Sequence, residues 1–340
     1  MPMPEFGRRP PTSHDVARAA GVSQPTVSRA LRGDPRVTEA TRERVARAAQ
    51  ELGYVASDRG RSLSTSRTGR VGVVVEDLDN PFYLELLDEL HDQLERADVR
   101  MIVFTPRHDD PEGLARLVDG SIDGVVLTTT FLDSPLPGLL RDRGFPFVLL
   151  NRIVDEPGVA TCSVDNASGG RLIAEAILAE GHHDIGAVFG PAETSTGRDR
   201  ERGVRAALEA AGVELPAART RRGSYTYESG HAAALELLGG DQRPTAVFCG
   251  NDVIALGALN ACHRLGLRVP HDVSVVGFDD IGMAGWDVYR LTTVRQDLRR
   301  MAQIAVETVL EAVVEPGADP KRVVLPPELV RRDTLGPPPA

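Results

Sequence analysis

The chain has 340 residues, of which 41% are hydrophobic and 26% are charged, and its formal net charge is −10. This balance is typical of a globular protein with two or three packing units, because a single core rarely grows to that length. No apolar run is long enough to span a bilayer, and the first thirty residues lack the apolar segment of a secretory signal. We therefore expect a cytoplasmic protein that does not associate with a membrane.

The charge is divided unevenly along the chain. Residues 1–70 contain 13 arginines and seven acidic residues, a net charge of +6, which leaves −16 for the remainder. A basic head on an acidic body is typical of a protein whose head meets the phosphates of a nucleic acid. The acidic body then needs a different role.

Residues 10–54 predict three short helices. Thr12 and Asp15 have the spacing of a capping box for the first helix, and Ser23 and Thr38 can cap the second and third. Two short helices joined by a tight turn at Gly21 make a helix-turn-helix. The side chains expected to face the core are Val16, Ala17, Ala20, Val27, Leu31, Val45, Ala48, Ala49 and Leu52.

The second of these helices is the expected reading element, because in a helix-turn-helix it enters the major groove with its N-terminal residues at the base edges. The amide of Gln24 can pair with adenine, and the guanidinium of Arg29 can fork onto guanine. Hydroxyls that suit phosphate oxygens belong to Ser23, Thr26 and Ser28. On these residues alone, a three-helix module that binds protein stays open as the alternative.

The segment DVARAAGVSQPTVSRAL, residues 15–31, resembles the N-terminal signature of the lactose-repressor and galactose-repressor family of transcriptional regulators. The matching positions are Asp15, Val16, Ala17, Ala20, Gly21, Val22, Ser23, Thr26, Val27, Ser28, Arg29 and Leu31. The resemblance implies that Gln24 and Pro25 occupy the family's variable specificity positions. Since proline has no side-chain donor, direct base reading there would rest on Gln24 and on methyl contacts.

Residues 57–70 are the expected hinge between a DNA-binding head, residues 1–56, and a body, residues 71–335. The stretch is rich in Ser, Arg and Gly and has no apolar period, which is typical of a flexible linker. The family resemblance implies that it becomes a short helix on the operator and that Leu63 wedges into the minor groove. An ordinary linker leucine is the alternative.

The body predicts two lobes, each a doubly wound parallel sheet, because short apolar runs alternate with amphipathic helices. The runs expected to be buried parallel strands are VGVVVED, RMIVFTP, DGVVLTTT, FPFVLLN, DIGAVFG, TAVFCGN and SVVGFDD. The fold class is therefore an all-α head plus an α/β body like that of periplasmic binding proteins. The resemblance places lobe one at about 71–165 and 295–325 and lobe two at about 166–294 and 326–335, with crossings near 166, 294 and 326.

Polar residues follow the expected strands, where ligands of doubly wound folds lie. They are Asp77, Asn80, Asn151, Arg152, Asp165, Asn251, Asp252, Asp279 and Asp280. Carboxylates, amides and arginines together suit a polyhydroxylated ligand. Aromatic residues that can form an apolar wall for a sugar face are Phe82, Tyr83, Tyr225 and Trp286. Each of these residues taken alone also fits an ordinary helix cap or loop.

The resemblance extends over the body through NPFY, SVDN, GND, VVGFDD, LTTVRQD and the spacing of Arg200 and Gly203. It implies effector contacts at Phe82, Asp165, Arg200, Asn251, Asp279 and Gln296. Thr196 adds a hydroxyl at the rim of the expected pocket, and Tyr225 adds an aromatic wall. The effector that we expect is a neutral sugar or sugar derivative, while purines and sugar phosphates stay open.

Three functions fit these residues to different degrees. The leading one is a homodimeric, nucleoid-associated repressor that binds a near-palindromic DNA operator and responds to a small-molecule effector, with activation as a variant. The second is a sugar receptor module without gene control, against which the head argues. The third is an enzyme, but the adjacent Asp279 and Asp280 point in different directions and make a poor acid–base pair. We expect no catalytic residue, cofactor or metal.

Overall fold

A computed structural model describes residues 11–31, 33–54, 67–105 and 117–339. The chain forms two compact units, Met1–Thr68 and Gly69–Ala340. Leu63 and most of the expected hinge lie outside the described residues. Among the helices that the structure describes, none has the length and apolar character needed to cross a membrane.

The head contains the three expected helices, α1 (Ser13–Ala20), α2 (Gln24–Leu31) and α3 (Glu39–Leu52). The predicted capping box is confirmed, since Thr12 and Asp15 each accept a hydrogen bond from the other's backbone N–H. Gly21 ends α1 at φ 63°, in the left-handed region that favours glycine. Thr38 precedes α3 but makes no side-chain cap bond, and its hydroxyl pairs with that of Thr41 instead.

Small apolar side chains build the core of the head. The buried set is Val16, Ala17, Ala20, Val27, Ala30, Val37, Val45, Ala48 and Ala49. The prediction that Leu31 and Leu52 face this core is wrong, because they are 39% and 40% exposed. Each is the last residue of its helix, and the neighbouring core contacts come from Ala30 and Tyr54.

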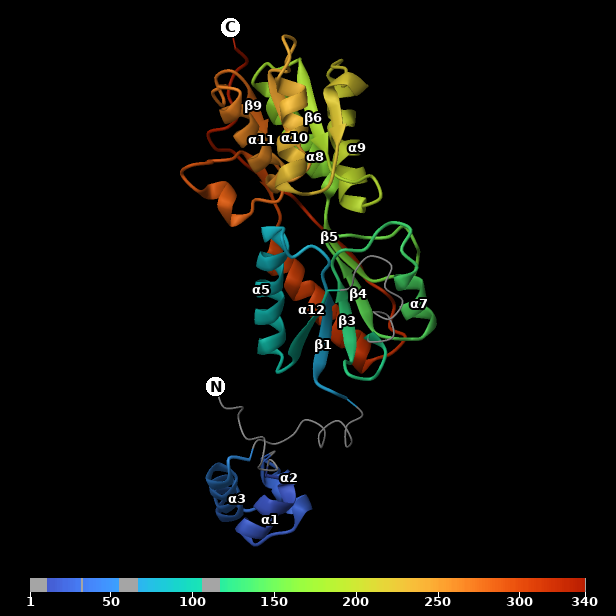
Figure 1. Cartoon of the computed structure of the whole chain (residues 1–340). Helices are drawn as coiled ribbons and strands as arrows, with labels where there is room; N and C mark the ends of the chain where they lie inside the picture. The colour runs from blue at the N-terminus through green and yellow to red at the C-terminus, as the bar shows by residue number, and fades with distance from the viewer. Residues whose placement is uncertain (1–10, 32, 55–66, 106–116, 340) are drawn as a thin grey trace, which may run out of the picture. The chain divides into compact units, whose positions relative to one another are not determined.

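The first lobe of the body is a parallel sheet in the order β11-β5-β4-β3-β1-β2, with helices packed beside it (Figure 1). The strands are β1 (Arg70–Val74), β2 (Arg100–Phe104), β3 (Gly124–Leu127), β4 (Phe147–Leu150), β5 (Thr161–Val164) and β11 (Arg322–Leu325). The helices are α5 (Pro81–Arg96), α7 (Leu136–Asp142) and α12 (Leu298–Val314). β2 was predicted to be buried, but it is an edge strand with half-buried and exposed side chains.

The second lobe is a parallel sheet in the order β7-β6-β8-β9. Its strands are β6 (Ile185–Phe189), β7 (Thr220–Arg222), β8 (Ala246–Cys249) and β9 (Ser274–Val276). Its helices are α8 (Asn166–Ala179), α9 (Ser195–Ala210), α10 (Tyr227–Leu238) and α11 (Asp252–Arg264), with 3-10 turns η1 (Ala217–Arg219) and η2 (Gly282–Gly285). The predicted all-α head and two-lobed α/β body are thus confirmed.

The chain passes between the two sheets three times (Figure 1). The crossings run from β5 to α8, from β10 (Thr293–Arg295) to α12, and from β11 to β12 (Glu328–Val330). β10 and β12 pair antiparallel, with Thr293 opposite Val330. Because β5 and β11 lead directly into crossings, the carboxyl ends of the first lobe's strands lie at the junction of the lobes.

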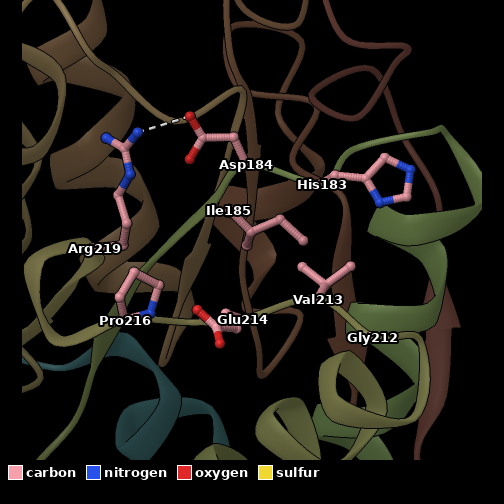
Figure 2. Close-up of a pocket in the computed structure, with 8 residues that line it drawn as sticks. All are labelled: His183, Asp184, Ile185, Gly212, Val213, Glu214, Pro216 and Arg219. Carbon is pink, nitrogen blue, oxygen red and sulfur yellow. Dashed lines mark hydrogen bonds and ion pairs between the residues drawn. The ribbon is translucent and has the colours of Figure 1, made fainter.

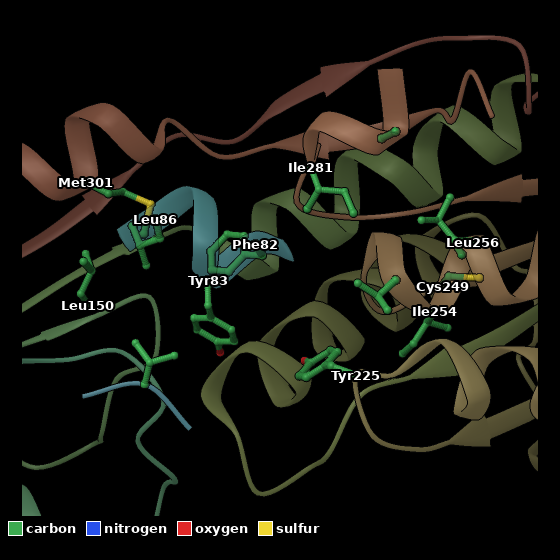
Figure 3. Close-up of a cluster of buried hydrophobic side chains, with 14 of the residues drawn as sticks. Phe82, Tyr83, Leu86, Leu150, Tyr225, Cys249, Ile254, Leu256, Ile281 and Met301 are labelled. Atoms are coloured by element: carbon green, nitrogen blue, oxygen red, sulfur yellow. The ribbon is translucent and has the colours of Figure 1, made fainter. Parts of the chain in front are cut away.

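One cluster of buried hydrophobic side chains includes residues of both lobes. Figure 3 shows Tyr83 and Leu86 of α5 on the first lobe's side, and Tyr225, Ile254 and Ile281 on the second lobe's side. All five are at most 7% exposed. The junction therefore has an apolar floor beside the polar strand ends.

Candidate functional site

Polar side chains from both lobes gather at the carboxyl ends of the strands. The first lobe supplies Thr129 after β3, and Asn151 and Arg152 after β4. The second lobe supplies Asn251 after β8 and Asp279 after β9. All five residues are at most 6% exposed, so their polar groups depend on partners inside the protein or on a ligand.

Arg200 of α9 is at the centre of the second lobe's polar group. Its Nε donates to Oδ1 of Asn166 at 2.9 Å, and its Nη1 donates to the backbone oxygen of Gly250 at 2.8 Å. Its Nη2 donates to Oδ1 of Asp279 at 2.8 Å. The guanidinium carbon lies 3.8 Å from the ring centroid of Phe278. One side chain therefore joins three segments that are far apart in the sequence.

Asp279 is held from two directions. Nε2 of Gln296 donates to the same Oδ1 that accepts from Arg200, again at 2.8 Å. The backbone of Asp279 has φ 118°, a conformation that L-residues rarely adopt and that costs about 1–3 kcal/mol. Burial raises the pKa of the Asp279 carboxyl, and the neighbouring Arg200 charge acts in the opposite direction.

Thr196 and Tyr225 form a second small group in the same lobe. Oγ1 of Thr196 lies 3.2 Å from the hydroxyl of Tyr225 and 3.3 Å from Oγ1 of Thr194, the residue that caps α9. The guanidinium carbon of Arg152, from the first lobe, lies 6.0 Å from the ring centroid of Tyr225. Groups from the two lobes are thus close neighbours here.

Phe82 and Tyr83 lie in the first turn of α5, with their rings edge to face at 5.2 Å, and both are 3% exposed. Burial raises the pKa of Tyr83 to about 12, while Arg152 lowers it and Tyr225 raises it further. The Tyr83 hydroxyl therefore stays protonated at neutral pH. It can both donate and accept hydrogen bonds.

Four buried polar atoms at this junction have no hydrogen-bond partner among the described residues. They are Oγ1 of Thr129, Oδ1 of Asn151, Nε of Arg152 and Oε1 of Gln296. Leaving one such group unsatisfied costs about 1–3 kcal/mol. The set comprises two acceptors, one donor and one hydroxyl that can do either. A ligand with several hydroxyl groups can satisfy this combination.

Two of the predicted residues have hydrogen bonds that serve the fold. Oδ1 of Asn251 accepts from the backbone N–H of Ile254 at 2.9 Å and begins α11. Asp165 is half-buried and begins α8 by accepting from the N–H and the hydroxyl of Ser168. Although burial raises the pKa of Asp165, the bonds from Ser168 lower it below its usual value. The other seven predicted effector residues, Asn251 among them, are buried.

Sequence reasoning named Asn151 and Arg152 as polar strand-end residues without counting them among the effector contacts, and it did not name Thr129. All three lie within two residues of the end of β3 or β4, so the rule that ligands lie at strand ends is the signal that finds them. Trp286, considered as an apolar wall, is 54% exposed and stacks on Tyr289. Trp286 is therefore not part of the buried group.

A separate hollow of 370 Å³ lies in the second lobe. Figure 2 shows its lining, which is His183, Asp184, Ile185, Gly212, Val213, Glu214, Pro216 and Arg219. The hollow opens at the amino end of β6, and Asp184 and Arg219 form an ion pair in its wall at 2.7 Å. It is thus at the opposite end of β6 from the polar strand ends, and the ionic groups of that pair are already satisfied.

Direct contacts also join the two lobes. The backbone of Gly282 donates to Oε1 of Glu85 at 2.8 Å. The others are Leu132 N–H to the Glu193 oxygen at 2.9 Å, Ile153 N–H to Oγ of Ser195 at 2.9 Å, and Arg198 with Asp155 at 2.6 Å. These contacts hold the lobes in the observed arrangement.

In the head, α2 presents a polar face to solvent. Ser23, Pro25 and Arg29 are exposed, and Gln24 and Thr26 are half-buried, as is Ser28. The hydroxyls of Ser23 and Thr26 pair at 2.8 Å, and Nε2 of Gln24 lies 3.3 Å from Oγ of Ser13. The first turn of α2 and the Arg29 side chain are therefore accessible to a partner.

Comparison with known proteins gives matches to both units. Residues 12–57 match the model of the lacI family of bacterial regulatory proteins, and residues 174–335 match a periplasmic binding protein-like domain. The transcriptional regulator CelR of Thermobifida fusca is 35% identical, over 96% of this chain and 99% of that protein. The transcriptional repressor PurR of Photorhabdus laumondii is 32% identical, over 95% and 96%.

Solved structures give the same result. A complex of the transcriptional regulator CelR with cellobiose is 34% identical, covers 95% of this chain and 99% of that one, and has a TM-score of 0.73. The lac repressor dimer bound to operator and the anti-inducer ONPF is 27% identical, covers 96% and 99%, and has a TM-score of 0.86. The similarity therefore extends over head and body together.

Proposed function

Because this chain belongs to the lacI family of bacterial regulatory proteins, we propose that it is a cytoplasmic transcriptional repressor that binds a near-palindromic operator as a homodimer and is controlled by a neutral sugar. The observation that carries the effector half of the proposal is the set of unsatisfied polar atoms at the junction of the lobes. The proposal assigns the chain no catalytic activity, in keeping with the relatives named as regulators.

The exposed face of α2 supports the assignment of DNA contacts. We assign base reading to Gln24 and Arg29, because an amide can pair with adenine and a guanidinium with guanine. Pro25 then offers only apolar contact. The phosphate contacts are assigned to Ser23, Thr26 and Ser28. Since the two heads of a homodimer each read one half-site, the operator should be near-palindromic.

The charge balance of the cleft supports a neutral effector. Of the two buried guanidinium groups at the junction, Arg200 is already paired with Asp279 and with two further acceptors. The charge of Arg152 is near the Asp77 carboxyl, whose pKa it lowers against the effect of burial. An anionic ligand would therefore have to compete with a carboxylate for either charge. The unsatisfied atoms of Asn151 and Gln296 are neutral amide oxygens, which accept from sugar hydroxyls.

The predicted effector residues fit this assignment as a group. They are Phe82, Asp165, Thr196, Arg200, Tyr225, Asn251, Asp279 and Gln296, to which we add Thr129, Asn151 and Arg152. The rings of Tyr83 and Tyr225 supply apolar surface for a sugar face. Cellobiose, which is bound in the solved complex of the related CelR, is the first sugar to test.

Control of DNA binding follows from the position of the cleft between the lobes. A ligand shifts an equilibrium only by its different affinity for the two states. The contacts of Glu85 with Gly282 and of Asp155 with Arg198 cross the junction, so a ligand there acts on the arrangement that these contacts define. A hundredfold preference for one arrangement supplies about 2.7 kcal/mol.

Selection of bound sequences from a random DNA pool, with the purified full-length chain, tests the proposal. The selection is run without ligand and with cellobiose, other disaccharides, monosaccharides, a sugar phosphate and a purine base. We expect a palindromic motif whose enrichment changes with one neutral sugar. No motif under any condition would contradict DNA reading, and a response to the sugar phosphate or the purine alone would contradict the neutral-sugar assignment.

A further inference from the structure

Asp252, the residue after Asn251, is 0% exposed and does not belong to the group of unsatisfied polar atoms. Its Oδ2 accepts from the backbone N–H of Ile281 at 3.0 Å, and its Oδ1 accepts from the hydroxyl of Thr293 at 2.5 Å. Its own N–H donates to the backbone oxygen of Phe278 at 2.8 Å. Asp252 is thus bonded to the chain on both sides of Asp279 and to the crossing strand β10.

The segment that Asp252 holds is strained. Asp279 and Asp280 have φ values of 118° and 56°, both in the left-handed half of conformational space. A Cβ on Gly277 would lie 2.2 Å from Oδ1 of Asp252, so the carboxyl group approaches the backbone at a distance that only glycine allows. Residues in such conformations persist only where the surrounding structure holds them.

The crossing strand β10 connects this segment to the rest of the cleft. Thr293 begins β10, and Gln296 follows its last residue. The backbone of Asp279 also donates to the oxygen of Val294 in the same strand at 2.8 Å. The two side chains that meet at Oδ1 of Asp279, those of Arg200 and Gln296, therefore depend on how this turn is seated against β10.

We propose that Asp252 is a positioning residue that seats the strained turn of residues 277–281 against β10, and so aligns Asp279 and Gln296 for the effector. The alignment of Asp279 and Gln296 for an effector rests on the proposed function, because Asp252 acts on the effector site without touching the ligand. The seating of the turn against β10 is a property of the free protein and does not depend on the effector.

The chemistry of Asp252 provides a conservative replacement. Burial, followed by the neighbouring charge of Asp279, raises the pKa of Asp252 well above its usual value, which favours the neutral acid. In Asp252→Asn the amide oxygen can still accept from Ile281, and the amide nitrogen can donate to the hydroxyl of Thr293. Asp252→Ala removes both bonds.

Hydrogen exchange of the Ile281 amide, measured on the full chain without ligand, tests the seating directly. We expect exchange in Asp252→Ala to be about tenfold faster or more, and exchange in Asp252→Asn to stay within about threefold of wild type. His182→Ala is the matched control, because His182 is 0% exposed in the same lobe but bonds to Thr245 and Gly336. It should lower the unfolding midpoint without changing exchange at Ile281.

Titration of wild type and of the same three variants, by calorimetry, with the neutral sugars of the selection panel, cellobiose first, tests the effector half. Asp252→Ala should weaken binding by about tenfold or more, with rescue in Asp252→Asn and no change in His182→Ala. Equal exchange in Asp252→Ala and His182→Ala would overturn the inference. If wild type binds no sugar, the proposed function fails, while the exchange comparison still decides whether Asp252 seats the turn.

Thr293→Val, which removes one of the two bonds, replaces Asp252→Ala if that variant does not fold. We expect exchange of the Ile281 amide in Thr293→Val to be about threefold faster than in wild type, and unchanged exchange would overturn the inference.

Discussion

Replacement of Asp279 by alanine perturbs the most buried ion pair of the cleft. The side chains of Asp279 and Arg200 are 5% and 4% exposed, with 2.8 Å between Oδ1 and Nη2. Removal of one partner of a buried pair leaves a desolvated charge and costs about 3–5 kcal/mol. Arg200 keeps hydrogen bonds to Asn166 and Gly250, so we expect a loss near the lower end, about 3 kcal/mol in the free energy of unfolding.

A double variant tests whether the cost comes from an unpaired charge or from lost packing. In Arg200→Met/Asp279→Ala both charges are absent, and methionine fills most of the arginine's volume. Because a buried pair can be replaced by apolar groups at little cost, the double variant should be more stable than Asp279→Ala alone. Asp279→Asn retains an acceptor for Arg200 and Gln296 and should cost less than the alanine variant.

Urea unfolding followed by circular dichroism measures these differences, and a sugar titration of operator binding measures the response. We expect Asp279→Ala to lose the effector response while retaining the operator affinity of the free protein. A loss of stability below about 1 kcal/mol in Asp279→Ala, or a double variant no more stable than Asp279→Ala, would refute the charge argument. A normal effector response in Asp279→Ala would show that the effector binds at a different place in the protein.

Three further predictions concern single residues. Arg29→Ala should cost about 1–3 kcal/mol at one base pair of each half-site in a binding assay, and an unchanged base preference there would contradict its reading role. Gly203→Ala should destabilise the body by about 2 kcal/mol or more in urea unfolding, because the added Cβ would lie 2.0 Å from the backbone oxygen of Ala167. Gly240→Ala is the control, because a Cβ there would meet open space, and equal costs of the two variants would count against the packing argument. Since burial raises the pKa of Asp252, the folded chain binds that proton more tightly than the unfolded chain, and stability falls as pH rises above 3.8. Asp252→Asn should therefore gain stability relative to wild type as pH rises from 3.8 toward the raised pKa, and a difference that stays constant with pH would be inconsistent with the raised pKa.

Much of the fold is readable from the sequence because its signals are local. The capping box of Thr12 and Asp15 and the short apolar runs place the head and seven of the strands correctly. Strands β5, β7, β10, β11 and β12 were not predicted, since each has at most four residues and includes polar ones, which leaves no clear apolar run. Leu31 was misplaced because apolar spacing does not show where a helix end leaves the core.

The candidate site was predictable as a set of strand ends but not as a network. The bond between Arg200 and Asp279 joins residues 79 positions apart, and sequence spacing has no information on such a pair. The unsatisfied atoms of Thr129 and Arg152 become visible only when every buried group is matched with its partner. Asp252 was noted only as a strand-end residue, and its role in holding the turn of Asp279 depends on tertiary contacts.

The most direct test of the account is the operator affinity of the wild-type chain, measured at fixed salt with and without each sugar of the panel. The account predicts that one neutral sugar shifts the operator Kd by about tenfold or more, in either direction, and that Asp279→Ala abolishes the shift. An operator affinity that no sugar changes, in a chain that binds the operator specifically, would contradict the claim that the cleft between the lobes controls the head.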